Sequence, residues 1–186
     1  MKLNKSLIWT LVLMVVVASL YRIIPGRPFG FAPQWALAIF GGAVVKDKRI
    51  ALVIPILSMF LSDLIYQGLF NAGLSPISGF YEGQWINYLL FASVTFFGFM
   101  IRRINVTNVL WVSLVAPTYF FIVSNFLTWV GIGEYVEYPK TFTGLMECYT
   151  AALPFYYYSL LSTVVFSAVL FGTWYFVIRR TKTSIA

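Results

Sequence analysis

The sequence predicts an all-α integral membrane protein, organised as a bundle of six transmembrane helices with both termini in the cytoplasm. Three observations lead to this fold class: an apolar composition, six apolar stretches, and basic residues concentrated in alternate gaps between those stretches. Of the 186 residues, 60% are hydrophobic and 10% are charged, whereas soluble domains carry about a quarter charged residues. Six spans and their loops use nearly the whole chain, so residues 1–186 are expected to form a single transmembrane domain.

The basic residues predict the orientation of the spans. The gaps after the first, third and fifth apolar stretches hold only Arg22, Arg27 and Lys140 of the 13 Lys and Arg residues, together with four of the six acidic residues. The other ten basic residues occupy the alternate gaps and the two ends: Lys2, Lys5, Lys46, Lys48, Arg49, Arg102, Arg103, Arg179, Arg180 and Lys182. Cytoplasmic loops carry an excess of Lys and Arg, so this alternation predicts six crossings with both ends inside.

The first span is expected at about residues 6–24, close to the ~20 residues that cross a hydrocarbon core. The run Pro25-Gly26-Arg27-Pro28 ends it. Two basic residues before an apolar run at 7–17 also fit a cleaved secretory signal. The apolar stretch continues through Leu20 and Ile23–Ile24, which favours a retained helix.

The second span, about residues 33–45, is short, and Pro33 suits a first helical turn. It is either re-entrant, tilted beside longer neighbours, or extended through 29–32. Ala38 and Gly42 permit a close helix contact within it, as Ala168 and Gly172 do in the last span. The third span, about 50–70, contains Asp63 and precedes a loop rich in Gly, Ser and Pro.

The fourth span is expected at about 84–101 and the fifth at about 109–130, which includes Pro117 and Asn125. The segment after the fifth span is the longest outer one, and its part 143–153 is expected to form a short helix near the membrane interface. The sixth span, about 154–178, starts with a Tyr triplet of the kind found in the aromatic belt of membrane proteins.

Composition excludes several classes of function. The net charge of +7 is explained by orientation in an anionic membrane, so no nucleic-acid partner is expected. The absence of His and the single Cys exclude an intrachain disulfide and a His/Cys zinc site, and no metal or cofactor is predicted. No P-loop motif occurs, so active transport would need an ion gradient or a partner.

Asp63 is the most informative candidate for a functional side chain. At 1.5 Å per residue it lies roughly 20 Å from the inner end of its helix, in the outer third of a ~30 Å core. Arg22 and Asn125 reach a similar height, and an ionisable group at membrane depth is a functional candidate by default. Alternatively, Asp63 has a structural role: it pairs with Arg22 or Arg27 and locks helices together, or accepts hydrogen bonds from the 25–32 turn.

The outer loops and helix ends concentrate aromatic and polar residues. Small-molecule sites combine apolar and aromatic walls with a few polar groups, and three helix N-termini with two Arg residues suit an anionic or polar ligand. The alternative for each aromatic residue is an interfacial girdle. The predicted solute-binding residues are Arg22, Arg27, Phe31, Gln34, Trp35, Asp63, Asn125, Trp129, Tyr138, Glu147 and Tyr149. No catalytic residue is predicted, because only Asp63 is clearly embedded, so the chain is not expected to be an enzyme.

Several motifs resemble an uncharacterised family of small bacterial membrane proteins whose members are labelled as transport proteins. They are Pro25, Arg27-Pro28, Phe31-Ala32-Pro33, Trp35-Ala36-Leu37-Ala38-x-Phe40-Gly41-Gly42-Ala43, Pro55, Ser62-Asp63-Leu64, Ser124-Asn125-Phe126-x-x-Trp129, Tyr138-Pro139-x-Thr141-x-x-Gly144-Leu145 and Cys148-Tyr149-x-Ala151-Ala152-x-Pro154-Phe155. That group is similar in length and topology to the S components of energy-coupling-factor (ECF) vitamin transporters.

The resemblance implies six helices and a substrate site that opens outward beneath the loops after spans one, three and five. It also implies a protein of the bacterial cytoplasmic (inner) membrane that takes up a vitamin-like solute, with an ECF-type energising module as a further partner. Two features depart from the S components: span one lacks the Ala-x-x-x-Ala coupling motif, and the His and Cys ligands of the cobalamin type have no equivalents. The alternative function is a non-transporting membrane subunit or scaffold whose polar cluster is purely structural.

Overall fold

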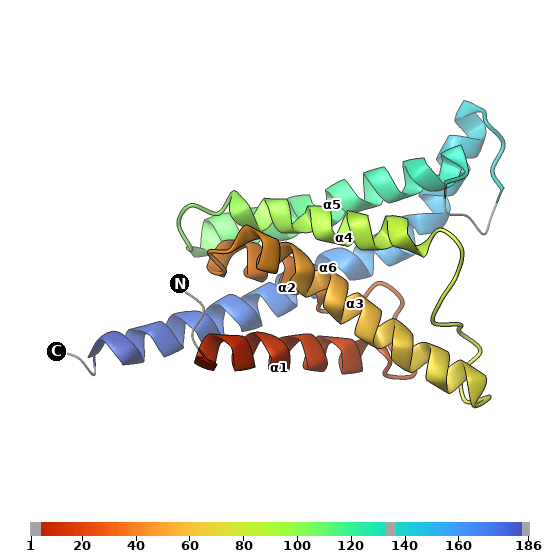
Figure 1. Cartoon of the computed structure of the whole chain (residues 1–186). Helices are drawn as coiled ribbons and strands as arrows, with labels where there is room; N and C mark the ends of the chain where they lie inside the picture. Colours follow the sequence, from red (N-terminus) through yellow and green to blue (C-terminus); the bar gives the residue numbers. More distant parts are fainter. Residues whose placement is uncertain (1–4, 133–136, 184–186) are drawn as a thin grey trace.

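The computed structural model of the chain describes residues 5–132 and 137–183, with side chains at 8–132 and 137–176. These residues form six α-helices and no strand (Figure 1). The helices are α1 (Lys5–Arg22), α2 (Gln34–Val44), α3 (Lys48–Asn71), α4 (Gln84–Phe99), α5 (Val106–Val130) and α6 (Phe142–Thr183).

Each of the six expected stretches corresponds to one helix, and the first five agree within three residues at each end. The sixth was wrong at its start, because no separate helix covers 143–153. Instead α6 runs unbroken from Phe142 through Pro154 for 42 residues. Proline removes one backbone donor and strains a helix, but membrane helices tolerate it where local contacts satisfy the freed groups.

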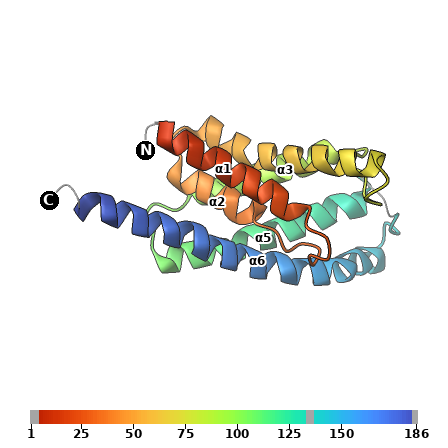
Figure 2. The ribbon, with the colours of Figure 1, turned by 90° about the horizontal axis from the view of Figure 1, so that it is seen from below.

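The short helix α2 lies at the centre of the bundle. It contacts all five other helices, and ten of its eleven residues are buried. Figure 2 shows it enclosed between α1, α3 and α6 when the bundle is seen from below. At its C-terminal half, Gly42 and Gly98 of α4 bring the two backbones together, because a Cβ on Gly42 would lie 2.4 Å from the carbonyl oxygen of Thr95. Because α2 is central, almost all of its residues are apolar or small.

The outer surface of the bundle is apolar, and several polar side chains face inward. Large apolar residues of α1, among them Trp9, Leu13 and Val17, are exposed. In contrast, Ser19 is buried and donates a hydrogen bond to the carbonyl oxygen of Ser58, 2.9 Å away on α3. Water disfavours an exposed apolar surface of this extent, whereas lipid accommodates it.

Among the described residues, three helices are long and apolar enough to cross a membrane: α3, α5 and the stretch Phe142–Phe176 of α6. The apolar helices Ile8–Arg22 and Gln34–Val44 are shorter. Together with the apolar surface, these lengths support a membrane protein.

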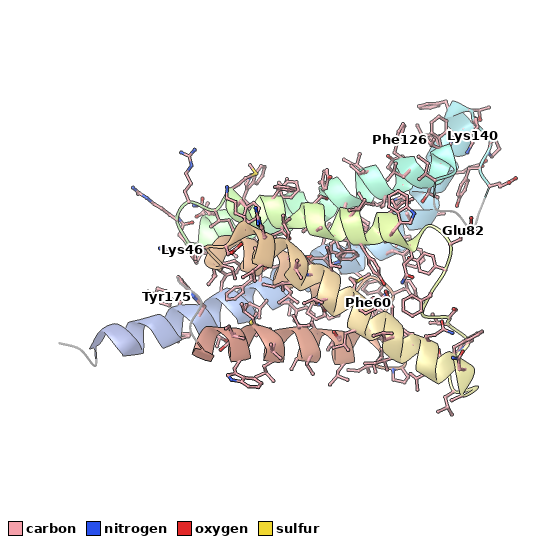
Figure 3. The ribbon with its side chains drawn as sticks, in the orientation of Figure 1. Lys46, Phe60, Glu82, Phe126, Lys140 and Tyr175 are labelled. Carbon is pink, nitrogen blue, oxygen red and sulfur yellow. The ribbon has the colours of Figure 1, made fainter. Side chains whose placement is uncertain are left out.

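The two ends of the bundle differ in charge and in loop length. One, here the basic end, carries the short turns 45–47 and 100–105 with exposed basic residues at 46, 48, 49, 102 and 103. The other, here the cavity end, carries the longer connections after α1, α3 and α5. Figure 3 shows Lys46 at the basic end and Glu82 and Lys140 at the cavity end. Helix α1 starts and helix α6 ends at the basic end (Figure 1).

Candidate functional site

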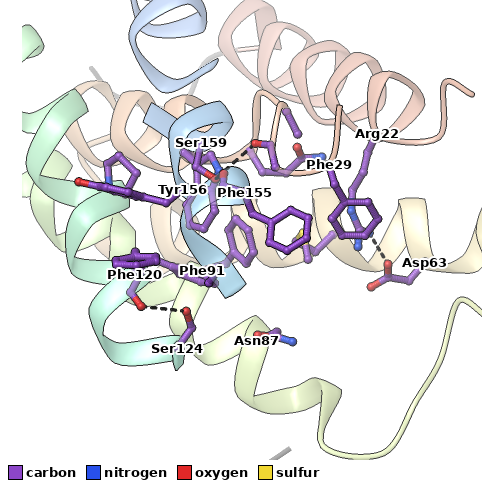
Figure 4. A pocket seen from close by; sticks show the side chains of 18 of the residues that line it. Arg22, Phe29, Asp63, Asn87, Phe91, Phe120, Ser124, Phe155, Tyr156 and Ser159 are labelled. Atoms are coloured by element: carbon purple, nitrogen blue, oxygen red, sulfur yellow. Dashed lines mark hydrogen bonds and ion pairs between the residues drawn. The ribbon is translucent and has the colours of Figure 1, made fainter. Parts of the chain in front are cut away.

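A cavity of about 680 Å³ lies between the helices at the cavity end (Figure 4). All six helices contribute residues to its lining, and α6 does so through its stretch 152–159. The lining residues are Arg22, Arg27, Phe29, Gly30, Ala32, Gln34, Trp35, Met59, Asp63, Tyr66, Ile77, Ser78, Gly79, Tyr81, Asn87, Phe91, Pro117, Phe120, Phe121, Ser124, Asn125, Ala152, Phe155, Tyr156 and Ser159.

Aromatic rings form much of the wall. On one side, Trp35 stacks on Phe91 with ring centroids 4.3 Å apart and meets Phe120 edge-on at 4.2 Å. On another side, Phe121 stacks on Tyr156 at 4.4 Å. Such offset and edge-to-face contacts are favourable and hold the rings in fixed orientations, so the cavity is bounded by rigid apolar faces.

A polar network centred on Asp63 lies at one edge of the cavity. Asp63 is 2% exposed and forms an ion pair with Arg22 through Oδ1. Its Oδ2 accepts hydrogen bonds from Gln84 Nε2 at 2.6 Å and from the Tyr88 hydroxyl at 2.7 Å. Both carboxylate oxygens therefore have partners, and the network joins α1, α3 and α4. The predicted pairing of Asp63 with Arg22 is confirmed.

Arg22 has hydrogen-bond partners on one side of its guanidinium group. Nη1 contacts Asp63 and donates to the hydroxyl of Ser62 at 2.6 Å. Nε and Nη2 have no hydrogen-bond partner among the described residues, and the side chain is 22% exposed and lines the cavity. The guanidinium carbon also lies 5.7 Å from the centre of the Tyr66 ring, within cation–π range.

Arg27 shapes the connection between α1 and α2. Nε and Nη2 donate to the carbonyl oxygen of Arg22 at 3.2 and 3.0 Å, and Nη1 donates to those of Pro28 and Phe31. Four of its five N–H groups are thus used on backbone oxygens. Arg27 lines the cavity as predicted, but its hydrogen bonds hold the loop in shape.

The same connection is anchored on α6. Gly30 has φ +87°, and a Cβ there would lie 2.5 Å from the carbonyl oxygen of Phe155. Only glycine allows this approach without strain. The hydroxyls of Ser159 and Ser162 both point at the Gly30 carbonyl oxygen, 3.4 Å away. The loop that carries Phe29 into the cavity is therefore seated on α6.

The connection between α3 and α4 covers the cavity beside Asp63. Gly79 lies so close to α3 that a Cβ would be 1.9 Å from the carbonyl oxygen of Asp63. Its own carbonyl oxygen accepts a hydrogen bond from Gln84 Nε2 at 2.9 Å. Gln67 of α3 accepts hydrogen bonds from the hydroxyl of Ser78 and the amide of Phe80. Side-chain amides thus hold this loop on the helices at its two sides.

Further polar groups line the cavity away from Asp63. Asn87 donates to the Tyr81 hydroxyl at 2.6 Å. Burial raises the pKa of the Tyr81 phenol and outweighs the opposite effect of the Asn87 hydrogen bond, so Tyr81 is neutral at physiological pH. Asn125 lines the cavity as predicted, but its Nδ2 donates to the carbonyl oxygen of Phe121 rather than to Asp63.

Gln34 is buried at the first turn of α2 and lines the cavity. Its Nε2 donates to the carbonyl oxygen of Ala18 at 3.0 Å and so ties α2 to α1. Its Oε1 is buried and has no hydrogen-bond partner among the described residues. Buried carbonyl oxygens rarely lack a hydrogen-bond donor.

Six predicted residues line the cavity: Arg22, Arg27, Gln34, Trp35, Asp63 and Asn125. Five others lie outside it: Phe31, Trp129, Tyr138, Glu147 and Tyr149. The ring of Phe31 packs against Tyr21 and Phe166. The remaining four belong to the end of α5, the following segment and the first turns of α6, where Trp129 Nε1 donates to the Pro139 carbonyl oxygen and the Tyr149 hydroxyl to that of Ile122. Glu134 and Tyr135, expected among the outer-loop residues, lie outside the described residues.

The partners of Asp63 on α4 were not predicted. Gln84 and Tyr88 are four residues apart, and in a helix this spacing places both side chains on one face. Gln84, Asn87 and Tyr88 are polar residues at the start of an otherwise apolar span, and that spacing was the signal available in the sequence. Tyr66 was missed as well, and its hydroxyl donates to the carbonyl oxygen of Arg22 at 2.8 Å.

The arrangement can enclose a small molecule between aromatic walls, with polar groups at defined points. Its volume falls within the roughly 300–1,000 Å³ of typical ligand sites. No group of three or more His, Cys, Asp or Glu side chains that could hold a metal ion occurs in the described part of the chain.

Comparisons with known proteins give a family but no relative of established function. Neither a curated protein nor a solved structure matches the chain, and no finding links it to ECF S components. A family model covers residues 2–184, which is nearly the whole sequence. The chain therefore belongs to the family of unknown function DUF6580.

Proposed function

We propose that this chain is a six-span protein of the bacterial cytoplasmic membrane that binds a small solute in the cavity and takes it up into the cell. In this proposal both termini and the basic end lie in the cytoplasm, and the cavity opens to the exterior. The observation that carries the proposal is the cavity itself, which is lined by aromatic rings and by polar groups such as Arg22, Gln34 and Asn87 at one end of the bundle.

The distribution of charge supports this orientation. The basic end carries five exposed basic residues, at 46, 48, 49, 102 and 103, against the single acid Asp47. In the described parts of the opposite connections, Arg27 and Lys140 are balanced by Glu82 and Glu137. Cytoplasmic loops attract Lys and Arg, so the basic end faces inward. The cavity then lies on the side from which an external solute arrives.

Release to the cytoplasm requires a change in the packing between the cavity and the basic end. Pro117 lines the cavity inside α5, and Pro154 interrupts the backbone hydrogen bonds of α6 close by. Proline sites are frequent places for helix bending, so these two helices are the elements proposed to move. The energy comes from an ion gradient or from a partner such as an ECF-type module, and the protein resembles S components in length and topology.

A solute panel tests the proposal directly. Full-length protein in nanodiscs is screened by thermal shift and calorimetry against vitamins and other small solutes of negative, neutral and positive charge. The variant Ala152→Trp fills the cavity, while Ala151→Trp places the same side chain at an exposed neighbour on α6. We expect a solute that binds wild type and Ala151→Trp but not Ala152→Trp. Solute binding in this cavity is contradicted if no solute binds, or if a solute binds Ala152→Trp as tightly as wild type.

A second candidate function is a non-transporting membrane subunit. It is favoured by one observation: both oxygens of Asp63 have partners within the protein. Such a network can have a purely structural role, which is to join α1, α3 and α4. This function predicts that a membrane partner co-purifies at a fixed stoichiometry. It also predicts that no solute of the panel binds. A cavity-dependent solute excludes it as the sole function.

A further inference from the structure

We infer that the solute is a monoanion: a single carboxylate, bound by the unpaired side of Arg22, on a flat aromatic or apolar body that packs between the cavity rings. This inference rests on the proposed function and adds the chemical class of the solute. It follows from the charge balance of the cavity, the hydrogen bonds of its two Arg residues and the nature of its walls.

The described residues that line the cavity carry one uncompensated positive charge. They include two cations, Arg22 and Arg27, and one anion, Asp63. The acidic residues Glu82, Glu137 and Glu147 are exposed and lie outside the lining. A charge surrounded by apolar walls is costly unless it is paired. A monoanionic solute neutralises the cavity, whereas a cation adds a like charge and a dianion leaves a negative excess.

The hydrogen bonds assign the carboxylate to Arg22 rather than to Arg27. Arg27 spends four N–H groups on backbone carbonyl oxygens. Arg22 uses only Nη1, on Asp63 and Ser62, and leaves Nε and Nη2 without a partner among the described residues. These two nitrogens form the edge that binds a carboxylate through two parallel hydrogen bonds.

Asp63 contributes by holding this edge in place. Its second oxygen is fixed by Gln84 and Tyr88, so the guanidinium group is oriented before the solute arrives. An already ordered side chain loses less entropy on binding. Asp63 is thus a positioning residue: it is only 2% exposed, and its partners Arg22, Gln84 and Tyr88 leave it little access to a cationic solute. That arrangement argues against reading the aromatic walls as a cation–π box.

The walls define the rest of the solute. Trp35, Phe91 and Phe120 form one set of rings, and Phe121 with Tyr156 forms another. A solute with a flat aromatic or apolar body packs well against such rings. Neutral polar groups, such as those of Asn87 and Ser124, lie elsewhere in the lining and suit uncharged substituents on the body.

Three probes with one ring system and different head groups test the inference: indole-3-acetate, indole-3-acetamide and tryptamine, which are anionic, neutral and cationic. Binding to the full-length protein is measured by calorimetry in nanodiscs of zwitterionic lipid, so that membrane charge does not bias the result. Arg22→Lys keeps a cation beside Asp63 but removes the two-nitrogen edge. Arg102→Lys makes the same exchange at the exposed basic end.

We expect the acetate to bind about tenfold to a hundredfold more tightly than the acetamide, the range for hydrogen bonds to a charged group, and tryptamine to bind most weakly. Arg22→Lys weakens acetate binding several-fold more than acetamide binding, because the two-nitrogen edge is lost, but it keeps tryptamine the weakest because the positive charge stays. Arg102→Lys leaves all three affinities unchanged. If Arg22→Lys does not fold, the order of the three affinities in wild type decides.

Two results overturn the inference while the proposed function stands. One is an acetamide or tryptamine affinity equal to that of the acetate. The other is binding of none of the three although the wider panel yields a neutral or cationic solute that Ala152→Trp abolishes. A wholly empty panel overturns the proposed function as well.

Discussion

The two halves of α2 show opposite kinds of packing. At its C-terminal half, toward the basic end, Gly42 and Gly98 bring α2 and α4 into backbone contact. At its N-terminal half, Gln34 and Trp35 line a cavity of about 680 Å³. One helix of eleven residues thus takes part both in a close backbone contact and in the lining of the cavity.

This difference teaches how a small membrane protein can keep a cavity open. At one end, the two glycines bring α2 and α4 into backbone contact and so fix their packing. At the other end, bulky aromatic rings line the space between the helices, the Asp63 network joins α1, α3 and α4 at its edge, and the connections cover it. Protein interiors are close-packed and contain few voids, so a cavity of this size marks the cavity end as the candidate functional part of the fold.

The largest expected effect concerns Asp63. Asp63→Ala leaves Arg22 without its ionic partner and removes the acceptor for Gln84 and Tyr88. Breaking a buried ion pair from one side costs about 3–5 kcal/mol. Thermal and denaturant unfolding in detergent should show a loss in this range.

The double variant Arg22→Gln/Asp63→Asn is the control for that loss, because it removes both charges and keeps polar side chains at both positions. It should recover a large part of the stability lost in Asp63→Ala. Equal stability of Asp63→Ala and wild type would show that the network contributes nothing to holding the cavity end together.

Gly98→Ala tests the close packing at the other half of α2. The new Cβ would lie 2.2 Å from the carbonyl oxygen of Ile39, and backbone cannot move aside cheaply. Overpacking of this kind costs about 1–3 kcal/mol. Unfolding experiments should therefore show a clear loss, smaller than that of Asp63→Ala.

Gly172→Ala is the matched control on α6. Packing of Ala168 and Gly172 inside the bundle was predicted, with a docking seam for another membrane protein as the alternative. The first was wrong, because a Cβ on Gly172 would meet nothing within 4 Å and Ala168 is exposed. Replacing a helical glycine with alanine in open space stabilises by up to about 1 kcal/mol. A destabilisation of Gly172→Ala as large as that of Gly98→Ala would argue against the assigned α2–α4 contact.

The smallest effect on stability is expected for Gly79→Ala in the connection over the cavity. Its Cβ would clash with the carbonyl oxygen of Asp63, but a loop can shift where a helix cannot. We expect a stability loss of about 1 kcal/mol, in the range usual for single substitutions, with a several-fold weaker affinity for any solute found. Gly68→Ala is a control inside α3, where a Cβ meets nothing within 4 Å. It should raise stability by up to about 1 kcal/mol, as for other helical glycines in open space, and leave solute affinity unchanged. Equal solute affinity of Gly79→Ala and wild type would separate this loop from binding.

Much of the helical architecture could be predicted because hydrophobic runs of this length have few other uses. The short length of α2 was visible, but its central position was not, because burial on all sides depends on where the other helices pack. The start of α6 was misjudged because Pro154 was taken as a helix start. Proline within a helix is decided by tertiary contacts that a single sequence does not display.

The candidate site was only partly predictable. An ionisable residue such as Asp63 is costly within an apolar span, so it could be recognised as a candidate from the sequence. Arg22 was the nearest cation at a matching height. Trp129 and Tyr149 were grouped with them because they belong to outer segments, yet α5 and α6 extend beyond the cavity and carry these residues away from it. Gln84 and Tyr88 were missed because neutral polar residues at the start of a span resemble ordinary interfacial residues.

The most direct test of the central claim, an externally open solute cavity opposite a cytoplasmic basic end, is thiol labelling in intact cells. The buried Cys148 is replaced by Ser, and cysteine is then placed either in the cavity with Ser124→Cys or at the basic end with Arg102→Cys. A small membrane-impermeant methanethiosulfonate reagent is added from outside. The account predicts rapid modification at position 124 and none at position 102 until the membrane is opened. Modification of position 102 alone from outside would contradict it.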